Sequence, residues 1–263
     1  MSESMLHTFQ AITDRYAAYS ERKVSTEISE HEDMFAHGYE DRGAMEHYLK
    51  VGRSAIDVIA NAMISGEKTD PQKVLDLPCG GGRVTRQLAA FFPEAKLFIG
   101  DVNKNKVQAV IETFGAMPIE PGIDFSIPAT ERFDLIWVGS LFTHLNDWLF
   151  ERALRWYVNA LEADGVLVFT THGRRHEHMQ SLQPHVPPER WAPASASLKS
   201  SGFGFVPYNP ANAADPLEIG TTVSSPAWVM RLVESDPSLR IIQFHEGGWV
   251  DAQDVVAIQK RPV

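Results

Sequence analysis

The spacing of apolar and polar residues along the chain predicts a buried sheet whose strands alternate with amphipathic helices. Short runs of consecutive apolar residues, typical of strands covered on both faces, fall at 73–77, 96–100, 117–119, 133–138 and 165–171. Residues with helical spacing separate these runs. Two further runs, at 240–244 and 254–259, are joined by a short link that favours an antiparallel hairpin. We therefore expect an α/β fold with a doubly wound, mostly parallel sheet.

Two segments fall outside this alternation. Apolar residues recur at helical spacing over 5–19 and 44–64, which predicts an N-terminal helical lid at 1–70 ahead of a main domain at 71–263. Residues 173–225 are rich in Pro, Ser, His and Asn but also carry aromatic side chains, which are uncommon in disordered linkers. We expect an ordered insertion here that covers the acceptor site. Ser225 and Pro226 then predict a capped helix that extends to about residue 233.

Composition narrows the class of protein. A chain of 263 residues with 44% hydrophobic content can bury the core of one α/β domain. Its 24 basic and 34 acidic residues give a net charge of −10, which argues against a general nucleic-acid-binding or anionic-membrane-binding role. The single cysteine, Cys79, excludes an internal disulfide bond. With no long apolar segment and no signal-like N-terminus, we expect a cytoplasmic protein without stable membrane insertion, and homo-oligomerisation stays open.

The first predicted strand leads into a candidate ligand cradle. It ends at Asp76 and is followed by a turn that contains Gly80 and Gly82, with a helical pattern over 83–92 behind it. Glycine lets backbone N–H groups approach a ligand closely. A second acid, Asp101, ends the next strand about 20 residues downstream, where a carboxylate can bind ribose hydroxyls. The third glycine of a dinucleotide fingerprint is missing, and Asp76 would repel a pyrophosphate, which favours a non-phosphate nucleotide.

Here the chain resembles the class I S-adenosylmethionine-dependent methyltransferases. Asp76, Gly80, Gly82 and Asp101 match the family's first two motifs, whereas Pro78 stands where its first glycine usually lies. The resemblance implies a Rossmann-like, seven-stranded, mostly parallel sheet with a C-terminal antiparallel hairpin, N-terminal helices and an insertion after the fifth strand. It also implies S-adenosylmethionine as the cofactor. The residues expected to contact this cofactor are Tyr48, Arg53, Asp76, Pro78, Cys79, Gly80, Gly82, Asp101, Val102, Gly139, Ser140 and Leu141.

The acceptor is predicted from weaker signals. Residues 170–173 and 248–255 resemble methyltransferases encoded with bacterial surface-glycan enzymes, which implies O-methylation of a sugar hydroxyl on a glycan or its precursor. Removing the hydroxyl proton suits histidine, and His144 and His172 each follow a predicted strand end. Either histidine could instead have a purely structural role. The substrate-binding candidates are Arg174, Trp191, Tyr208 and Trp249, for which exposed surface or core packing is the alternative.

Three alternatives stay open at this stage. The chain could methylate a small natural product, it could be a non-catalytic cofactor-binding partner of another protein, or it could be an NAD-dependent oxidoreductase. Asp76 and Thr85 count against the oxidoreductase because they do not fit the dinucleotide fingerprint. His172, His176 and His178 form a histidine cluster, but no carboxylate or thiolate is spaced with them. We therefore expect no metal site.

Overall fold

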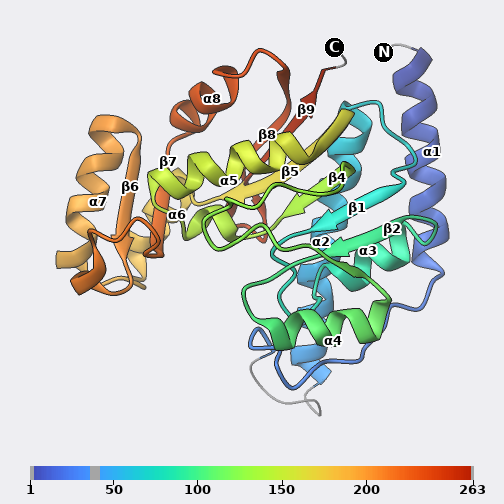
Figure 1. The fold of residues 1–263 in the computed structure, drawn as a ribbon, viewed down its shortest axis with the longest axis horizontal. Coiled ribbons are helices and arrows are strands. Elements are labelled where there is room, and N and C mark those ends of the chain that lie inside the picture. Colours follow the sequence, from blue (N-terminus) through green and yellow to red (C-terminus); the bar gives the residue numbers. More distant parts are fainter. Residues whose placement is uncertain (1–2, 36–41, 262–263) are drawn as a thin grey trace.

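The protein is described by a computed structural model that covers residues 3–35 and 42–261. It is built around one seven-stranded sheet with helices packed on both faces (Figure 1). The strand order is β3-β2-β1-β4-β5-β9-β8, in which β1 to β5 are parallel and β9 runs antiparallel to both neighbours. These strands are β1 Lys73–Asp76, β2 Lys96–Ile99, β3 Met117–Pro118, β4 Phe133–Val138, β5 Leu161–Thr171, β8 Leu239–Trp249 and β9 Gln253–Lys260. This arrangement confirms the predicted fold class.

Eight α-helices lie within the described residues. They are α1 Glu3–Ser20, α2 Arg42–Ser65, α3 Thr85–Phe91, α4 Lys104–Phe114, α5 Asp147–Ala160, α6 Arg174–Leu182, α7 Pro188–Ser201 and α8 Pro226–Glu234. The predicted cap of α8 is confirmed, because the Ser225 hydroxyl accepts a hydrogen bond from the backbone N–H of Trp228. No helix in the described part of the chain is long and apolar enough to cross a membrane.

The core has two halves, one on each face of the sheet. Val74 and Leu135 pack with α2, α3 and α4 on one face, whereas their neighbours Leu75 and Ile136 pack with α5 and α8 on the other. Successive strand residues point to opposite faces, so both faces must be apolar when both are covered. This explains why the strands read as continuous apolar runs rather than as alternating patterns.

Two strands are longer than the sequence predicts. β5 begins at Leu161, which pairs with Phe133 across an irregularity in the ladder, while Asp164 takes a positive φ of 61°. β8 continues through polar residues to Trp249, because its backbone keeps pairing with β9 as far as Gln253. Hydrogen bonding between strands, rather than hydrophobicity, extends both elements, so the apolar pattern alone could not show it.

The segment after β5 folds into α6, α7 and a separate two-stranded antiparallel sheet, β6 Phe203–Pro207 and β7 Gly220–Ser224. Figure 1 shows it protruding to one side of the main sheet. It has its own small hydrophobic core, made of Val186, Trp191, Ala194, Leu198, Val206 and Val223. β7 anchors it, because the N–H groups of Gly220 and Ser224 donate to the carbonyls of His144 and His172. The role of this insertion at an acceptor site stays a prediction.

Candidate active site

The carboxyl ends of three adjacent strands bring the predicted site residues together. β1 pairs with β2 on one side and with β4 on the other, so Asp76, Asp101 and Gly139 lie along one edge of the sheet. The connections from β1 and β4 run in opposite directions across the sheet, which makes this edge the topological switch point where open α/β sheets bind ligands.

The turn after β1 leaves open space beside its backbone. The N–H of Gly80 donates to Asp101 Oδ2 at 3.0 Å, which ties the turn to the end of β2. Gly80 has a φ of 53°, and a Cβ built on it meets no atom within 4 Å. Gly82 has a φ of 85° and lies against Val110 and Phe114 of α4. The turn therefore leaves room for a ligand at Gly80, and the binding of a ligand there stays a prediction.

The two acids beside this turn have different surroundings. Asp76 is buried, and its Oδ2 accepts a hydrogen bond from the Thr85 hydroxyl at 2.6 Å. Burial, with a contribution from the nearby Asp101 charge, raises the pKa of Asp76 to about 7. The Asp101 carboxylate is more accessible and also accepts the N–H of Asn103 at 2.9 Å. A cationic ligand in the cradle would favour the ionised form of Asp76.

Arg83 is a candidate ligand-binding residue that the sequence analysis missed. It directly follows the glycine turn, and its guanidinium carbon lies 6.0 Å from the ring centroid of Tyr48 and 5.9 Å from that of Trp249. Within the described residues the guanidinium forms no hydrogen bond or ion pair. Burial lowers the pKa of Arg83, although Glu32 and Asp76 lie close enough to oppose that shift. A half-buried cation without a partner is suited to binding an anionic group.

Arg53, for which the sequence leaves open a cofactor contact or simple helix surface, lies beside α1. Its side chain is exposed on α2, and its guanidinium carbon is 5.7 Å from the ring centroid of Tyr19 in α1. Tyr48, the other predicted contact from α2, is buried and donates its hydroxyl to Glu32 Oε2 at 2.7 Å. Of these two α2 residues, only Tyr48 adjoins Arg83.

The segment between α1 and α2 packs against the glycine turn. Arg86 donates through Nη1 to the carbonyls of Ser25 and Glu27, at 2.8 and 2.9 Å. Glu32 contacts the turn itself, since a Cβ built on Gly81 would lie 2.5 Å from Glu32 Oε2. Part of the predicted N-terminal lid thus touches the cradle, and its opening and closing stay a prediction.

Three further predicted cofactor contacts occupy the same turn and strand ends. Pro78 follows Leu77 through a cis peptide bond. Cys79 is buried, its N–H donates to the Gly100 carbonyl at 2.8 Å, and burial raises the pKa of its thiol, so it is suited to a turn rather than to nucleophilic chemistry. Val102, in the turn between β2 and α4, is 81% exposed and offers an apolar surface to a flat ring.

A hydrogen-bond chain fixes the loop after β4. Ser140, with a φ of 63°, donates its N–H to the Thr170 hydroxyl at 2.8 Å, and that hydroxyl donates to Gln253 Oε1 at 2.6 Å. Gln253 Nε2 in turn donates to the Ser140 hydroxyl at 2.9 Å. The sequence analysis missed Gln253, because the antiparallel pairing that brings β9 beside β5 is a tertiary feature. The chain of bonds positions Gly139 and Leu141 on either side of Ser140.

His144 and His172 are both held by carbonyl groups of β7. The Nδ1 of His172 lies 3.2 Å from the Thr222 carbonyl, which can only accept, so this Nδ1 carries the proton and Nε2 keeps its lone pair. The Nδ1 of His144 lies 3.1 Å from the Gly220 carbonyl and 2.6 Å from the Tyr208 hydroxyl, which can either donate or accept. His144 has the tautomer that a proton acceptor at Nε2 requires when its Nδ1–H donates to the carbonyl.

His172 also stacks on His176, with ring centroids 3.6 Å apart and an angle of 9° between the rings. Burial and the neighbouring histidines lower the pKa of His172 to about 3, and burial lowers that of His176 to about 4. Burial also lowers the pKa of His144. His178 is exposed. In the described parts of the chain, no three His, Cys, Asp or Glu side chains are grouped so that they could hold a metal ion.

The four predicted substrate-binding residues have different positions. Tyr208 is half-exposed and its hydroxyl lies 2.6 Å from His144 Nδ1, so it reaches the histidines. Trp191 lies in the core of the insertion and donates its Nε1–H to Glu177. Trp249 is buried edge-on against Trp137. The fourth residue, Arg174, forms an exposed ion pair with Glu246. Of the three aromatic rings, Tyr208 alone offers a half-exposed face to a sugar.

The histidine stack predicts acid sensitivity. In the folded protein the pKa values of His172 and His176 lie below the usual 6.5. Below pH 6.5 the unfolded chain therefore binds more protons than the folded protein does. The free energy of unfolding then decreases as the pH falls from 6.5 towards 4. The variant His172→Gln/His176→Gln should lose less stability between pH 7 and pH 4, by on the order of 6 kcal/mol for the two histidines together, since one pKa unit corresponds to about 1.4 kcal/mol.

Urea unfolding at both pH values measures this difference. The raised pKa values of Asp76 and of buried Asp254 act in the opposite sense, but they are common to both proteins and cancel in the comparison. The exposed neighbour His178, changed to Gln, is the control and should behave as the wild type. An equal acid loss in all three proteins would contradict the prediction.

Known proteins with a similar sequence or fold are methyltransferases. No protein-family model matches the chain. A malonyl-[acyl-carrier protein] O-methyltransferase of Bacillus cereus is 30% identical over 118 residues, and the match spans 42% of this chain and 40% of that relative.

Two solved structures superpose on most of the chain. One is an O-methyltransferase family protein from Burkholderia thailandensis, with a TM-score of 0.53 and 12% identity over 98% of this chain and 71% of the other. The second is the N-methyltransferase NodS of Bradyrhizobium japonicum in complex with S-adenosylhomocysteine, with a TM-score of 0.51 and 13% identity over 96% and 99% of the two chains. The chain therefore has the fold of the class I S-adenosylmethionine-dependent methyltransferases.

Proposed function

We propose that the protein is an S-adenosylmethionine-dependent methyltransferase that binds its cofactor at the shared edge of β1, β2 and β4. The observation that carries this proposal is the guanidinium of Arg83, which has no hydrogen-bond or ion-pair partner among the described residues and lies beside an open glycine turn flanked by Asp76 and Asp101. A cation next to two carboxylates complements an amino acid attached to a nucleoside. The residues present thus fit this cofactor, which supplies an activated methyl group on its sulfonium sulfur.

In this proposal each residue has a distinct task. Arg83 binds the carboxylate of the amino-acid part, Asp101 accepts hydrogen bonds from the ribose hydroxyls, and Val102 packs against the adenine. Asp76, at the first strand end, stabilises the positive charges of the ligand and becomes ionised as it does so. Gly80 permits the close approach of the ligand to the turn. Most of the rate enhancement then comes from holding the acceptor in line with the methyl group.

We infer that the acceptor atom is a hydroxyl oxygen, with a sugar of a glycan or glycan precursor as the first candidate. Support comes from His144 beside the half-exposed ring of Tyr208. In this proposal the Nδ1–H of His144 donates to the Gly220 carbonyl, and its Nε2 takes the hydroxyl proton. His172, with a pKa of about 3, is better suited to accepting a hydrogen bond that orients the acceptor than to taking a proton.

A carboxylate acceptor is the second candidate, and the O-methyltransferase of Bacillus cereus favours it, because that relative is named for an acid carried on a protein. A carboxylate oxygen is already deprotonated at neutral pH and needs no general base. The two candidates therefore differ in how much turnover they lose when His144 is replaced. A small natural product with a free hydroxyl would behave like the sugar.

Isothermal titration with S-adenosylhomocysteine and, separately, with NAD tests the cofactor. We expect micromolar binding of the former and no binding of NAD. The reverse result would establish the oxidoreductase alternative, and the absence of binding by either would contradict a cofactor-binding cradle. Binding of S-adenosylhomocysteine without conversion of any offered sugar, acid or pathway extract would favour a non-catalytic, cofactor-binding partner.

A further inference from the structure

The outer face of α5 forms a basic track on an acidic protein. Trp148, Arg152, Arg155 and Asn159 recur at helical spacing on this face, while the opposite face of the helix packs into the core. Together with residues of the loop before β4 and with Lys260, they line a groove of about 700 Å³.

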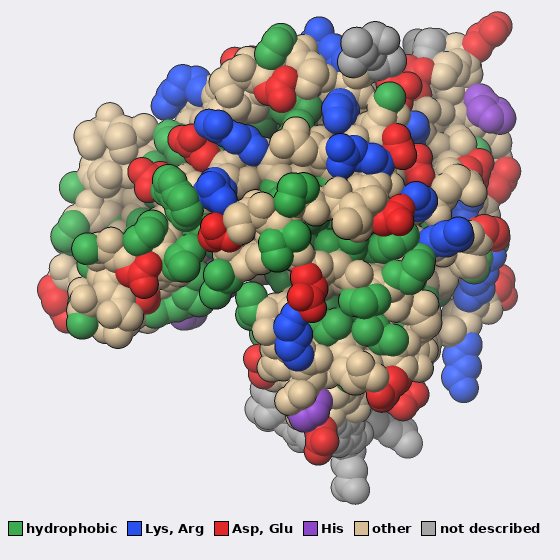
Figure 2. Space-filling model, in the orientation of Figure 1, with side chains coloured by type: hydrophobic (Ala, Val, Ile, Leu, Met, Phe, Trp, Pro, Cys, Tyr) green, Lys and Arg blue, Asp and Glu red, His purple; other side chains and the backbone are tan. Residues whose placement is uncertain are grey.

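The charge of this groove is opposite to that of the chain. Its lining carries four cationic side chains and one acidic one, Glu151, whereas the whole chain has a net charge of −10. The cations are Arg132, Arg152, Arg155 and Lys260. Figure 2 shows Lys and Arg side chains gathered over the region of α5. The groove is therefore a local site for anionic partners that the rest of the surface repels.

Arg132 and Arg155 of the track can take up new partners, whereas Arg152 is held more firmly, because its Nε–H also donates to the Asp124 carbonyl at 2.7 Å. Arg155 forms an ion pair with Glu151, and Arg152 forms one with Asp124, each at 3.3 Å. The four side chains are between 32% and 75% exposed. Exposed pairs of this kind contribute little stability and exchange readily. Arg132 is exposed and forms no ion pair with any residue that the structure describes.

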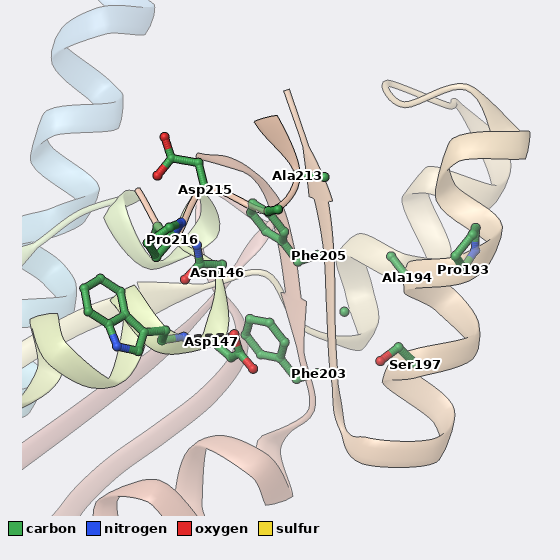
Figure 3. A pocket seen from close by; sticks show the side chains of 13 residues that line it. Asn146, Asp147, Pro193, Ala194, Ser197, Phe203, Phe205, Ala213, Asp215 and Pro216 are labelled. Atoms are coloured by element: carbon green, nitrogen blue, oxygen red, sulfur yellow. Dashed lines mark hydrogen bonds between the residues drawn. The ribbon is translucent and has the colours of Figure 1, made fainter. Parts of the chain in front are cut away.

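A pocket of mixed character adjoins the track at its end nearest the insertion. It has a volume of about 430 Å³ and lies between α5, β6 and α7 (Figure 3). The rings of Phe203 and Phe205 give it an apolar part, whereas Asp147 and Asp215 also line it, so it suits an apolar side chain but not a carboxylate. Trp148, which is 43% exposed, lines both the pocket and the track. The guanidinium carbon of Arg152 lies 4.9 Å from the centroid of its ring. The two hollows thus form one continuous surface.

We propose that this surface docks an acidic amphipathic helix of a partner protein. An apolar side chain of that helix fills the pocket at Phe203 and Phe205, and carboxylates along it pair with Arg132, Arg152 and Arg155. α5 has 14 residues, so the track is about 20 Å long and matches about four turns of a partner helix. A nucleic acid fits less well, because Glu151 and Asp124 interrupt the track and because Asp147 and Asp215 in the pocket repel phosphates.

The test uses a fluorescein-labelled, 16-residue helical peptide with glutamates on one face and a phenylalanine near one end, followed by fluorescence anisotropy. We expect a micromolar Kd that weakens with salt, and no binding of the same peptide with lysine in place of glutamate. Arg132→Glu/Arg155→Glu should weaken binding at least about 10-fold, because two attractive contacts become repulsive. Trp148→Ala should weaken the binding of the phenylalanine-bearing peptide but not the binding of a peptide with alanine at that position.

The control variant, Lys23→Glu/Lys199→Glu, reverses two exposed lysines outside the groove and should bind the peptide as the wild type does. All variants should bind S-adenosylhomocysteine equally, which shows that they are folded and separates this proposal from the proposed function. An equal loss of peptide affinity in the control variant would overturn the proposal, as would the absence of binding at peptide concentrations up to millimolar. So would tighter binding of a single-stranded DNA oligonucleotide, or a concentration-dependent dimer that Trp148→Ala abolishes.

Discussion

Replacing Arg83 by Met should weaken the binding of S-adenosylhomocysteine by about 10- to 100-fold, since hydrogen bonds to charged groups contribute about 1.5–3 kcal/mol. Methionine keeps an aliphatic stem between the rings of Tyr48 and Trp249 but removes the charge. Isothermal titration gives the affinity. Adenosine, which has no carboxylate, should bind the variant and the wild type equally, which locates the lost contact at the amino-acid end.

The matched control is Arg53→Met on α2, which should change the affinity less than about threefold, because this exposed arginine lies beside Tyr19. The Arg83 variant should also be at least as stable as the wild type to heat, because removing a half-buried cation without a partner relieves a desolvation cost. The assignment is wrong if Arg53→Met loses the affinity instead. A marked fall in the Tm of Arg83→Met would give that arginine a structural role.

Replacing His144 by Ala should lower kcat by at least about 100-fold if the acceptor is a hydroxyl, since general bases typically contribute factors of this size. The Kd for S-adenosylhomocysteine should stay within twofold. His172→Gln should lose less turnover than His144→Ala, because a base with a pKa of about 3 accepts protons poorly near neutral pH. Formation of S-adenosylhomocysteine with each acceptor class measures the rates.

The exposed histidine on α6, His178, provides the control, and His178→Ala should turn over as the wild type. Normal turnover of a carboxylate acceptor by His144→Ala would point to the second candidate acceptor. If His144→Ala and His172→Ala both convert a hydroxyl acceptor at normal rates, no histidine base operates. The variant Tyr208→Phe tests the neighbouring hydroxyl. A small loss of turnover in this variant would leave His144 as the main proton acceptor.

The fold and the geometry of the glycine turn could be predicted from the sequence, whereas the binding of a ligand at that turn stays a prediction. Buried parallel strands need apolar side chains on both faces, so β1, β2, β4 and β5 were recognisable as apolar runs. The turn was recognisable because it needs positive φ at Gly80 and Gly82, which glycine adopts without strain. Asp76 and Asp101 could be paired in advance, because the carboxyl ends of adjacent parallel strands meet at one edge. These are local or topological constraints.

Tertiary packing determines which side chains lie beside the glycine turn. The sequence pointed to Arg53 and not to Arg83, yet Arg53 lies beside Tyr19, whereas the guanidinium of Arg83 lies near the rings of Tyr48 and Trp249. The surroundings of the two histidine rings depend on carbonyls of β7, which lie 50 and 76 residues away along the chain. Contacts between distant segments depend on how whole layers pack, and no local pattern of residues encodes them.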